Sequence, residues 1–400
     1  MSRRLTLGLT LLAFAGASPA CECNDDSTKK PDAGMTPDAG ARDGAMVGDQ
    51  GARRESSVAD AARTEGGGHS DFGPPRDGRP ADAAPLSFSC KAFTAPAGWT
   101  VATGYRAVVI ADTTKGLKQP VALTFAGGAY LNALYVVDQS DQKIYFVDVN
   151  TGLTRVFSDG ATWTPKPKLL TSIVWDKKGQ LDGALYVGDQ GGDGDADSVV
   201  YRLDAKGAAT VFTKAPGPGL DDVFGMVFSP GAPYPTGLFI TGDTDGSNDD
   251  WGVFDATGKG SVFSQLGGAE GLAVDESGKY GGAGANLFAA RPAGGGYPGD
   301  DTISSVGPDG KVIKVLLAKT PGIHAPAFAP KGAFNEELFA ASWSSHKVLR
   351  ISAAGTATDL ASGLSLTNYD GNILAFTPDG STLHVADRQN GRVVCIEPTK

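Results

Sequence analysis

The chain has 400 residues, of which 56 are glycine and 41% are hydrophobic, and its formal net charge at pH 7 is −10. Glycine is about twice as frequent as the usual ~7%, but the absence of a Gly-X-Y period excludes collagen, and the apolar fraction is sufficient for a sizeable core. The acidic balance argues against a nucleic-acid partner, because a phosphate backbone needs a basic face.

Residues 1–20 have the layout of a secretory signal peptide. Arg3 and Arg4 precede an apolar run over 5–15, which is too short to span a bilayer, and small residues lead to Cys21. This arrangement resembles a bacterial lipoprotein signal. The resemblance implies that Cys21 is acylated and that the exported protein sits in the bacterial cell envelope, periplasmic or on the outer surface, with a lipid anchor as its only membrane contact. Simple cleavage, which gives a secreted protein, is the alternative.

Residues 21–88 are dominated by Asp, Ala, Gly, Pro and Arg, and the sequence Pro-Asp-Ala-Gly occurs at 31–34 and again at 37–40. Few apolar side chains are available to offset the entropy of ordering, so we predict a disordered segment. About 65 flexible residues reach ~45 Å. With an acylated Cys21 this segment is a tether, and otherwise it is a linker without a defined task.

Residues 89–400 contain six copies of a unit with four short apolar runs. One recurring apolar position and a second, independent landmark follow the same spacing of about 50 residues. The first set is Phe125, Trp175, Phe228, Val274, Phe328 and Phe376, and the second is Tyr135, Tyr186, Phe239, Phe288, Phe339 and His384. Four-stranded sheets repeated at this period are typical of propeller blades, so we predict an all-β, six-bladed β-propeller. His384 replaces an aromatic residue and is expected to be a core residue.

The last unit supplies only three strands, so we predict that an N-terminal strand over 105–110 completes the sixth blade and hides the sheet edges at the seam. Cys90 begins the domain and Cys395 lies in its last strand. A ring brings these positions together, and in an exported protein we expect them to form a disulfide.

Ligand sites of propellers usually lie on the face where the first strand of each blade begins. Several polar residues are predicted there, with aromatic and imidazole side chains in nearby loops. The candidates for ligand binding are Thr171, Asp222, Trp343, His346, Tyr369 and Asp370, and Glu270, His324 and Asn372 occupy further positions around the channel mouth. The alternative is that these groups solvate a water-filled channel. Trp163, Trp251, Trp343 and Tyr369 either stack on sugars or belong to blade cores.

The segment 372–380, Asn-Ile-Leu-Ala-Phe-Thr-Pro-Asp-Gly, resembles the repeat of SMP-30/gluconolactonase-like propellers, and 270–278 is similar to another repeat of that family. NHL-repeat propellers share this repeat pattern. The resemblance implies six blades and a divalent cation in the channel, with Glu270 and Asn372 at ligand-type positions. Val121 stands where those lactonases carry a ligand glutamate. His324 is the catalytic candidate with Glu270, because an ordinary imidazole titrates near neutrality.

Two acidic loops are candidates for calcium binding, because alternating carboxylates in a loop can point at one hard cation. The first loop contains Asp193, Asp195 and Asp197, and the second contains Asp243, Asp245 and Asp249. Solvated acidic turns are the alternative. No phosphate-binding loop, zinc-type cysteine pair or serine-hydrolase elbow occurs, so we expect no nucleotide or redox cofactor.

These observations favour a monomeric propeller that binds a small-molecule, glycan or protein ligand on its acidic channel face. The alternative is a calcium-assisted lactonase or esterase, in which a metal near Glu270 and Asn372 polarises a carbonyl and His324 transfers protons.

Overall fold

The structure, a computed structural model, describes residues 88–90, 94–192, 197–218, 220, 222–242, 251–266, 268–282, 286–291, 301–367 and 371–399. The chain divides into two units, 1–73 and 74–400, and all described residues belong to the second. The predicted signal peptide, the lipidation site Cys21 and the predicted tether up to residue 87 lie outside the described residues.

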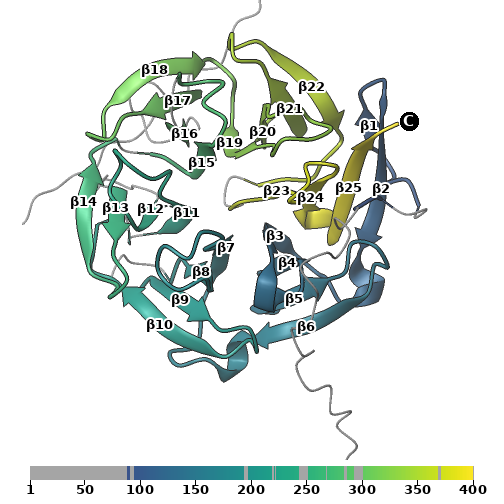
Figure 1. The fold of residues 1–400 in the computed structure, drawn as a ribbon. Helices are drawn as coiled ribbons and strands as arrows, with labels where there is room; N and C mark the ends of the chain where they lie inside the picture. Colours follow the sequence, from purple (N-terminus) through teal and green to yellow (C-terminus); the bar gives the residue numbers. More distant parts are fainter. Residues whose placement is uncertain are drawn as a thin grey trace, which may run out of the picture. The chain divides into compact units, whose positions relative to one another are not determined.

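Six antiparallel sheets form a closed ring, which confirms the six-bladed propeller (Figure 1). Blade one contains β3 (Pro120–Ala126), β4 (Ala133–Asp138), β5 (Lys143–Val147) and β6 (Thr154–Asp159). Blade two contains β7 (Leu170–Trp175), β8 (Leu185–Asp189), β9 (Val199–Leu203) and β10 (Ala209–Lys214). Blade three contains β11 (Val223–Phe228), β12 (Leu238–Gly242), β13 (Trp251–Phe254) and β14 (Gly260–Ser264).

The other three blades repeat this order. Blade four contains β15 (Gly271–Asp275), β16 (Asn286–Arg291), β17 (Thr302–Val306) and β18 (Val312–Leu317). Blade five contains β19 (Ile323–Phe328), β20 (Leu338–Ser342), β21 (Lys347–Ile351) and β22 (Ala357–Ser362). Blade six contains β23 (Leu374–Phe376), β24 (Leu383–Asp387) and β25 (Arg392–Pro398), and its outer strand is β2 (Tyr105–Ala111).

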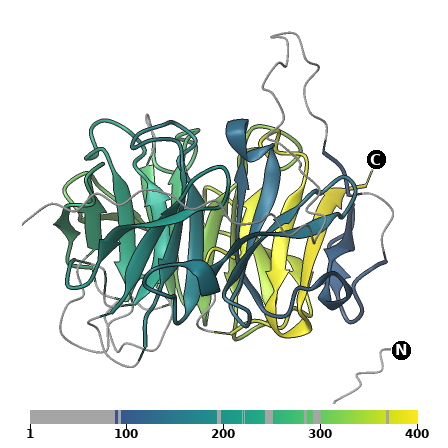
Figure 2. The same ribbon diagram turned by 90° about the horizontal axis from the view of Figure 1, so that it is seen from below.

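In each blade the first strand lies next to the channel and the fourth lies at the rim, and the strands run between the two faces of the ring (Figure 2). The middle strands β4 and β8 are buried along their whole length, because neighbouring blades cover both of their faces. The helical elements are single 3-10 turns: η1 (Thr113–Lys115), η2 (Gly128–Tyr130), η3 (Gly160–Thr162) and η4 (Arg388–Asn390). None of the helices in the described part of the chain is long and apolar enough to cross a membrane.

Turn glycines between the third and fourth strands explain part of the high glycine content. Gly207 (φ +83) and Gly258 (φ +76) have left-handed backbone conformations. A methyl group on Gly207 would come within 2.2 Å of the Phe157 carbonyl oxygen, and one on Gly258 within 2.1 Å of that of Phe212. These glycines therefore permit both the tight turn and close contact with the outer strand of the preceding blade.

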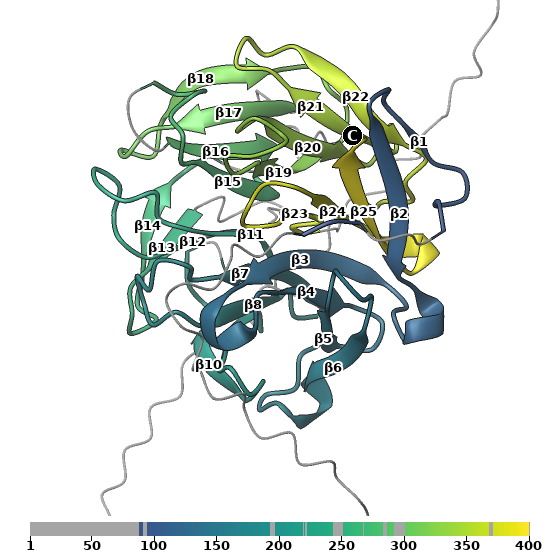
Figure 3. The same ribbon diagram turned by 45° about the vertical axis from the view of Figure 1, so that its right-hand side comes forward.

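The N-terminal strand closes the ring as predicted. β2 pairs antiparallel with β25, with Tyr105 opposite Pro398 and Val108 opposite Cys395 (Figure 3). A second short strand, β1 (Thr100–Val101), pairs with β22 and gives blade five a fifth strand. The sequence did not predict β1, because two residues carry no periodicity. The residues before blade one therefore bind to the outer edges of two neighbouring blades.

A disulfide and a set of polar contacts hold the seam. Cys90 and Cys395 are joined, with their sulfur atoms 2.07 Å and their Cα atoms 5.8 Å apart. The Cys90 amide donates to Glu397 Oε2 at 2.8 Å, and Arg106 Nη2 donates to the Cys90 carbonyl at 2.8 Å. The disulfide and the bond to Glu397 fix the segment 88–90 to β25, and the bond from Arg106 fixes it to β2.

His384 is a core residue, as predicted. Its side chain is fully buried, and its ring packs edge-on against Phe125 with the ring centroids 5.1 Å apart. Burial lowers the pKa of this imidazole to about 3, although a backbone contact with Ala375 opposes the shift. His384 is therefore neutral at physiological pH.

Asp176, which follows β7, organises the tight connection to β8. Its carboxylate is 1% exposed and accepts backbone hydrogen bonds from Gln180, Leu181, Asp182 and Gly183 at 2.8–3.0 Å. Asp176→Ala would leave these four amides without their acceptor, so we expect it to lower the free energy of unfolding by about 3 kcal/mol, measured by urea denaturation. Asp204→Ala is the matched control, because Asp204 accepts only from exposed turn amides and its removal should cost less than ~1 kcal/mol. Equal losses would contradict this role of Asp176.

Candidate functional site

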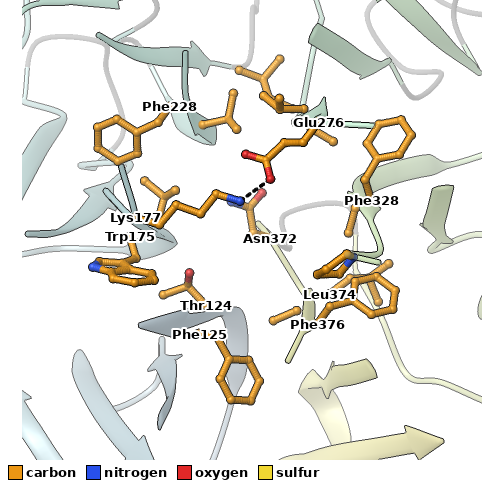
Figure 4. Close-up of a pocket in the computed structure, with 18 of the residues that line it drawn as sticks. Thr124, Phe125, Trp175, Lys177, Phe228, Glu276, Phe328, Asn372, Leu374 and Phe376 are labelled. Carbon is orange, nitrogen blue, oxygen red and sulfur yellow. Dashed lines mark hydrogen bonds and ion pairs between the residues drawn. The ribbon is translucent and has the colours of Figure 1, made fainter. Parts of the chain in front are cut away.

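A pocket of about 490 Å³ occupies the central channel and is lined by residues of the innermost strand of every blade (Figure 4). The lining continues past the ends of these strands to Lys177, Ser229, Glu276 and Lys331. We call the face where the innermost strands end the trailing face, and the face where they begin the leading face. The pocket therefore opens on the trailing face, whereas the sequence analysis placed the ligand site on the leading face.

Most residues that line the pocket are apolar. They include the six residues of the first repeat landmark, of which five are aromatic and the three phenylalanines at 125, 228 and 376 are only 8–9% exposed: Phe125, Trp175, Phe228, Val274, Phe328 and Phe376. They occur once per blade because each lies at the same place near the end of its innermost strand. In the sequence these residues mark the blade period and carry no sign that they line a pocket.

Asn372 forms the inner end of the pocket. Its Nδ2 donates to the Met226 carbonyl at 3.2 Å, and its own carbonyl accepts from the Leu123 amide at 2.7 Å. Blade six therefore contacts blades one and three across the channel. A methyl group on the preceding Gly371 would lie 2.0 Å from the Thr171 carbonyl oxygen, so only glycine fits at this crossing. The segment 371–372 thus crowds the channel between the pocket and the leading face.

Asn372 also has a polar atom aimed into a buried environment. Its Oδ1 is buried and has no hydrogen-bond partner among the described residues. A buried amide oxygen without a partner is unfavourable unless a water molecule or ligand group satisfies it. Asn372 is thus the predicted site residue that the structure places in the pocket.

Three charged residues form a bridge at the mouth of the pocket. Lys177 Nζ lies 2.6 Å from Glu276 Oε2, and Lys178 Nζ lies 3.1 Å from Glu276 Oε1. Burial would raise the pKa of the Glu276 carboxyl, but the charges and hydrogen bonds of the two lysines outweigh it and lower that pKa. No sequence pattern links these residues, because 99 positions separate Lys177 from Glu276.

The two catalytic candidates do not line the pocket. His324 in β19 is fully buried, with Nδ1 3.2 Å from the Gly322 carbonyl. Burial lowers the pKa of the His324 imidazole to about 4, against backbone contacts with Gly322 and Ala341 that raise it. Glu270 precedes β15, is half-buried, and donates its backbone amide to the Ala290 carbonyl. Proton transfer by His324 stays a prediction, and it requires an opening of the structure around this side chain.

Four of the six predicted ligand-binding residues belong to the described part of the chain, and they differ in exposure. Thr171 is fully buried and donates its hydroxyl to the Val223 carbonyl, so it presents no group to a ligand here. Asp222 and Trp343 are half-buried, and His346 is exposed in the loop after β20. Tyr369 and Asp370 lie outside the described residues. Binding by the leading face stays a prediction.

Two of the tryptophans considered for sugar stacking belong to blade cores. Trp163 and Trp251 are 4% and 1% exposed. Trp163 Nε1 donates to Ser158 Oγ at 2.9 Å, and Trp251 Nε1 donates to the Leu266 carbonyl at 2.6 Å. Their aromatic faces are therefore occupied by protein.

Aspartates at the ends of second strands have a structural role on the leading face. Asp138 accepts the amides of Lys118 and Gln119, and Asp189 accepts those of Lys168 and Leu169. Both side chains are at most 2% exposed. These carboxylates fix the loops that lead into the first strands, so part of the acidity of this face points inward.

The calcium candidates are only partly described. Asp193, Asp195, Asp243, Asp245 and Asp249 lie outside the described residues. Asp197 forms an ion pair with Lys168 and accepts the Gly192 amide at 2.9 Å. Within the described ranges no three His, Cys, Asp or Glu side chains gather as a metal site. Calcium in these two loops stays a prediction.

Comparison with known proteins supports the fold. No model of a protein family matches the chain, and no curated protein has a similar sequence. A gluconolactonase from Xanthomonas campestris has a similar structure, with a TM-score of 0.52 at 12% identity over 75% of this chain and 91% of its own. The PQQ domain of a pyranose dehydrogenase from Coprinopsis cinerea has a TM-score of 0.51 at 14% identity, over 78% of this chain and 100% of its own. A second structure, described as a putative gluconolactonase, has a TM-score of 0.51 at 14% identity, over 75% of this chain and 94% of its own. At these identities the likeness establishes the propeller fold.

Proposed function

We propose that this propeller is a binding protein that holds a small, largely apolar organic molecule in the pocket of its central channel. We further propose that it is exported and attached to the cell envelope through a lipid on Cys21, with residues 21–88 as the tether. A secreted form is the alternative, in which the same pocket binds the ligand without a membrane anchor.

The observation that carries this proposal is the shape and lining of the pocket. Small-molecule sites are concave, mostly apolar, and contain a few placed polar groups, with volumes of roughly 300–1,000 Å³. A pocket of about 490 Å³ with mostly apolar lining residues, an amide at its inner end and charges at its mouth fits this description. All six blades contribute to the walls, so the rigid ring preorganises the site.

The hydrolase alternative is less well supported by the geometry. It requires Glu270, His324 and Asn372 to act together around one small site. Asn372 alone among them lines the pocket, and the pKa of about 4 leaves the buried His324 neutral at pH 7. A general base must also reach the proton that it abstracts, and the fully buried His324 does not line the pocket.

The test is binding of a neutral, apolar fluorescent probe, N-phenyl-1-naphthylamine, to the full chain. Ala327 lines the pocket near the end of β19 and is half-buried, so Ala327→Trp should fill the cavity. We expect this variant to weaken binding at least tenfold in a fluorescence titration, because bulk in a preformed pocket excludes the probe. Thr210→Trp, which adds the same side chain at an exposed position of β10, controls for the new tryptophan. Equal affinities of the two variants would contradict the proposed site.

A further inference from the structure

We propose that the ligand of this pocket is an organic anion, and that the Glu276 carboxylate competes with its anionic group for Lys177 and Lys178. This inference rests on the proposed binding function and adds the chemical class of the ligand. Glu276 then acts as an internal competitor that keeps the two lysines in place at the mouth.

The geometry of the mouth resembles an anion site that is filled by the protein's own carboxylate. Each Glu276 oxygen contacts one lysine, at 2.6 Å for Lys177 and 3.1 Å for Lys178. The lysines follow β7 in blade two and Glu276 follows β15 in blade four, so the bridge passes blade three. Figure 4 shows Lys177 and Glu276 reaching toward each other over Asn372. A ligand that extends from Asn372 to the mouth therefore meets both lysines.

The bridge is suited to being displaced. The side chains of Lys177, Lys178 and Glu276 are 53%, 43% and 45% exposed. Ion pairs at this exposure contribute little to the stability of the protein, because water screens the charges and the long side chains lose rotamer freedom when they are held in one position. A ligand anion that also gains contacts with the apolar wall can therefore replace Glu276.

Displacement of Glu276 makes two cations available at the mouth. The charged residues of the lining are Lys177, Lys178 and Lys331 against Asp275, Glu276 and Glu336, a formal balance of 3 − 3 = 0. Asp275 is 1% exposed and accepts the backbone amides of Ser277, Gly278 and Tyr280. Glu276 is the carboxylate that pairs with Lys177 and Lys178, so its displacement frees these two lysines for an anionic group of the ligand.

Two probes with the same aromatic skeleton test the proposal on the full chain. 1-Anilinonaphthalene-8-sulfonate is anionic, and N-phenyl-1-naphthylamine lacks the sulfonate. The readout is the ratio of their dissociation constants, so that changes in packing cancel. We expect Glu276→Gln to shift this ratio about threefold to fivefold in favour of the sulfonate, because the competitor is removed. Lys177→Met and Lys178→Met should shift it in the opposite direction by a similar factor.

Glu336→Gln is the matched control. Glu336 is a second carboxylate of the lining and forms no ion pair with a described residue. Its removal changes the charge of the mouth equally but frees no lysine, so we expect a smaller shift than for Glu276→Gln. A ratio that Glu276→Gln leaves unchanged, or shifts toward the neutral probe, overturns the anion proposal. If instead Ala327→Trp leaves the binding of both probes unaffected, the proposed function itself fails.

Discussion

Between pH 8 and pH 4 the wild-type protein is expected to lose about 3 kcal/mol of its free energy of unfolding because of His384, and His384→Phe should abolish this loss. The native pKa of His384 is about 3, against 6.5 for an ordinary imidazole. As the pH falls below about 6.5, the unfolded chain takes up a proton at this position and the native protein does not until about pH 3. The contribution of His384 to the free energy of unfolding is therefore fully present above pH 6.5 and is lost as the pH falls from about 6.5 to about 3. Phenylalanine cannot bind a proton, so the loss from this position disappears.

The measurement is urea denaturation at a series of pH values. At each pH the free energy of unfolding of the wild type is subtracted from that of the variant, and this difference is followed against pH. The difference removes the contribution of His324, whose pKa of about 4 acts in the same direction in both proteins. Tyr135→Phe is the control at the equivalent position of blade one. Burial raises the pKa of Tyr135, so this residue stays neutral and its replacement should cost the same at every pH. A His384→Phe difference that does not grow toward low pH would contradict the buried neutral state.

The double variant Cys90→Ala/Cys395→Ala should lose on the order of 5 kcal/mol as an upper figure. The disulfide closes a loop with a sequence separation of 305 residues, and in the chain-entropy model a bond of this span strongly restricts the unfolded chain. Both positions are at most 1% exposed, so alanine leaves only small cavities in the native seam. The midpoint of urea denaturation is the measurement.

Reduced wild-type protein and the variant Arg106→Met show whether the loss of stability comes from the missing cross-link. Wild-type protein under reducing conditions should behave as the double variant does, because both lack the cross-link. Arg106→Met removes a hydrogen bond to the Cys90 carbonyl and an ion pair with Glu397, but the Arg106 side chain is 47% exposed, so this variant should change stability far less. If the double variant denatures at the wild-type midpoint, the cross-link does not contribute in solution.

The sequence was sufficient to predict the ring because propeller blades are local units. The residues from Phe125 to Phe376 recur every 46–54 positions, and a period of this length specifies one blade each time. The strand over 105–110 was predictable because the sixth unit lacked one. β1 was not, since it depends on the edge that β22 presents and not on its own two residues.

The pocket was less accessible to prediction, for a geometric reason. A repeat shows that Trp175 and Phe228 share a place in their blades, but not which end of the channel is open. That depends on Gly371 and Asn372, which contact blades one and two through their backbone and blade three through the Asn372 side chain. The bridge from Lys177 to Glu276 likewise depends on the relative position of two blades that are not neighbours in the ring. Such contacts leave no pattern in a single sequence.

The pairing of β2 with β25 has a consequence for synthesis of the protein. β2 is among the first strands to leave the ribosome, and its partner is the last. For most of translation the chain therefore carries an unpaired strand whose amides and carbonyls are available to wrong partners. Blades one to five each have four strands from contiguous residues and can fold as these emerge, whereas blade six must wait for β25. We therefore expect ring closure to be the late step of folding, and incomplete chains to be the species most prone to aggregate.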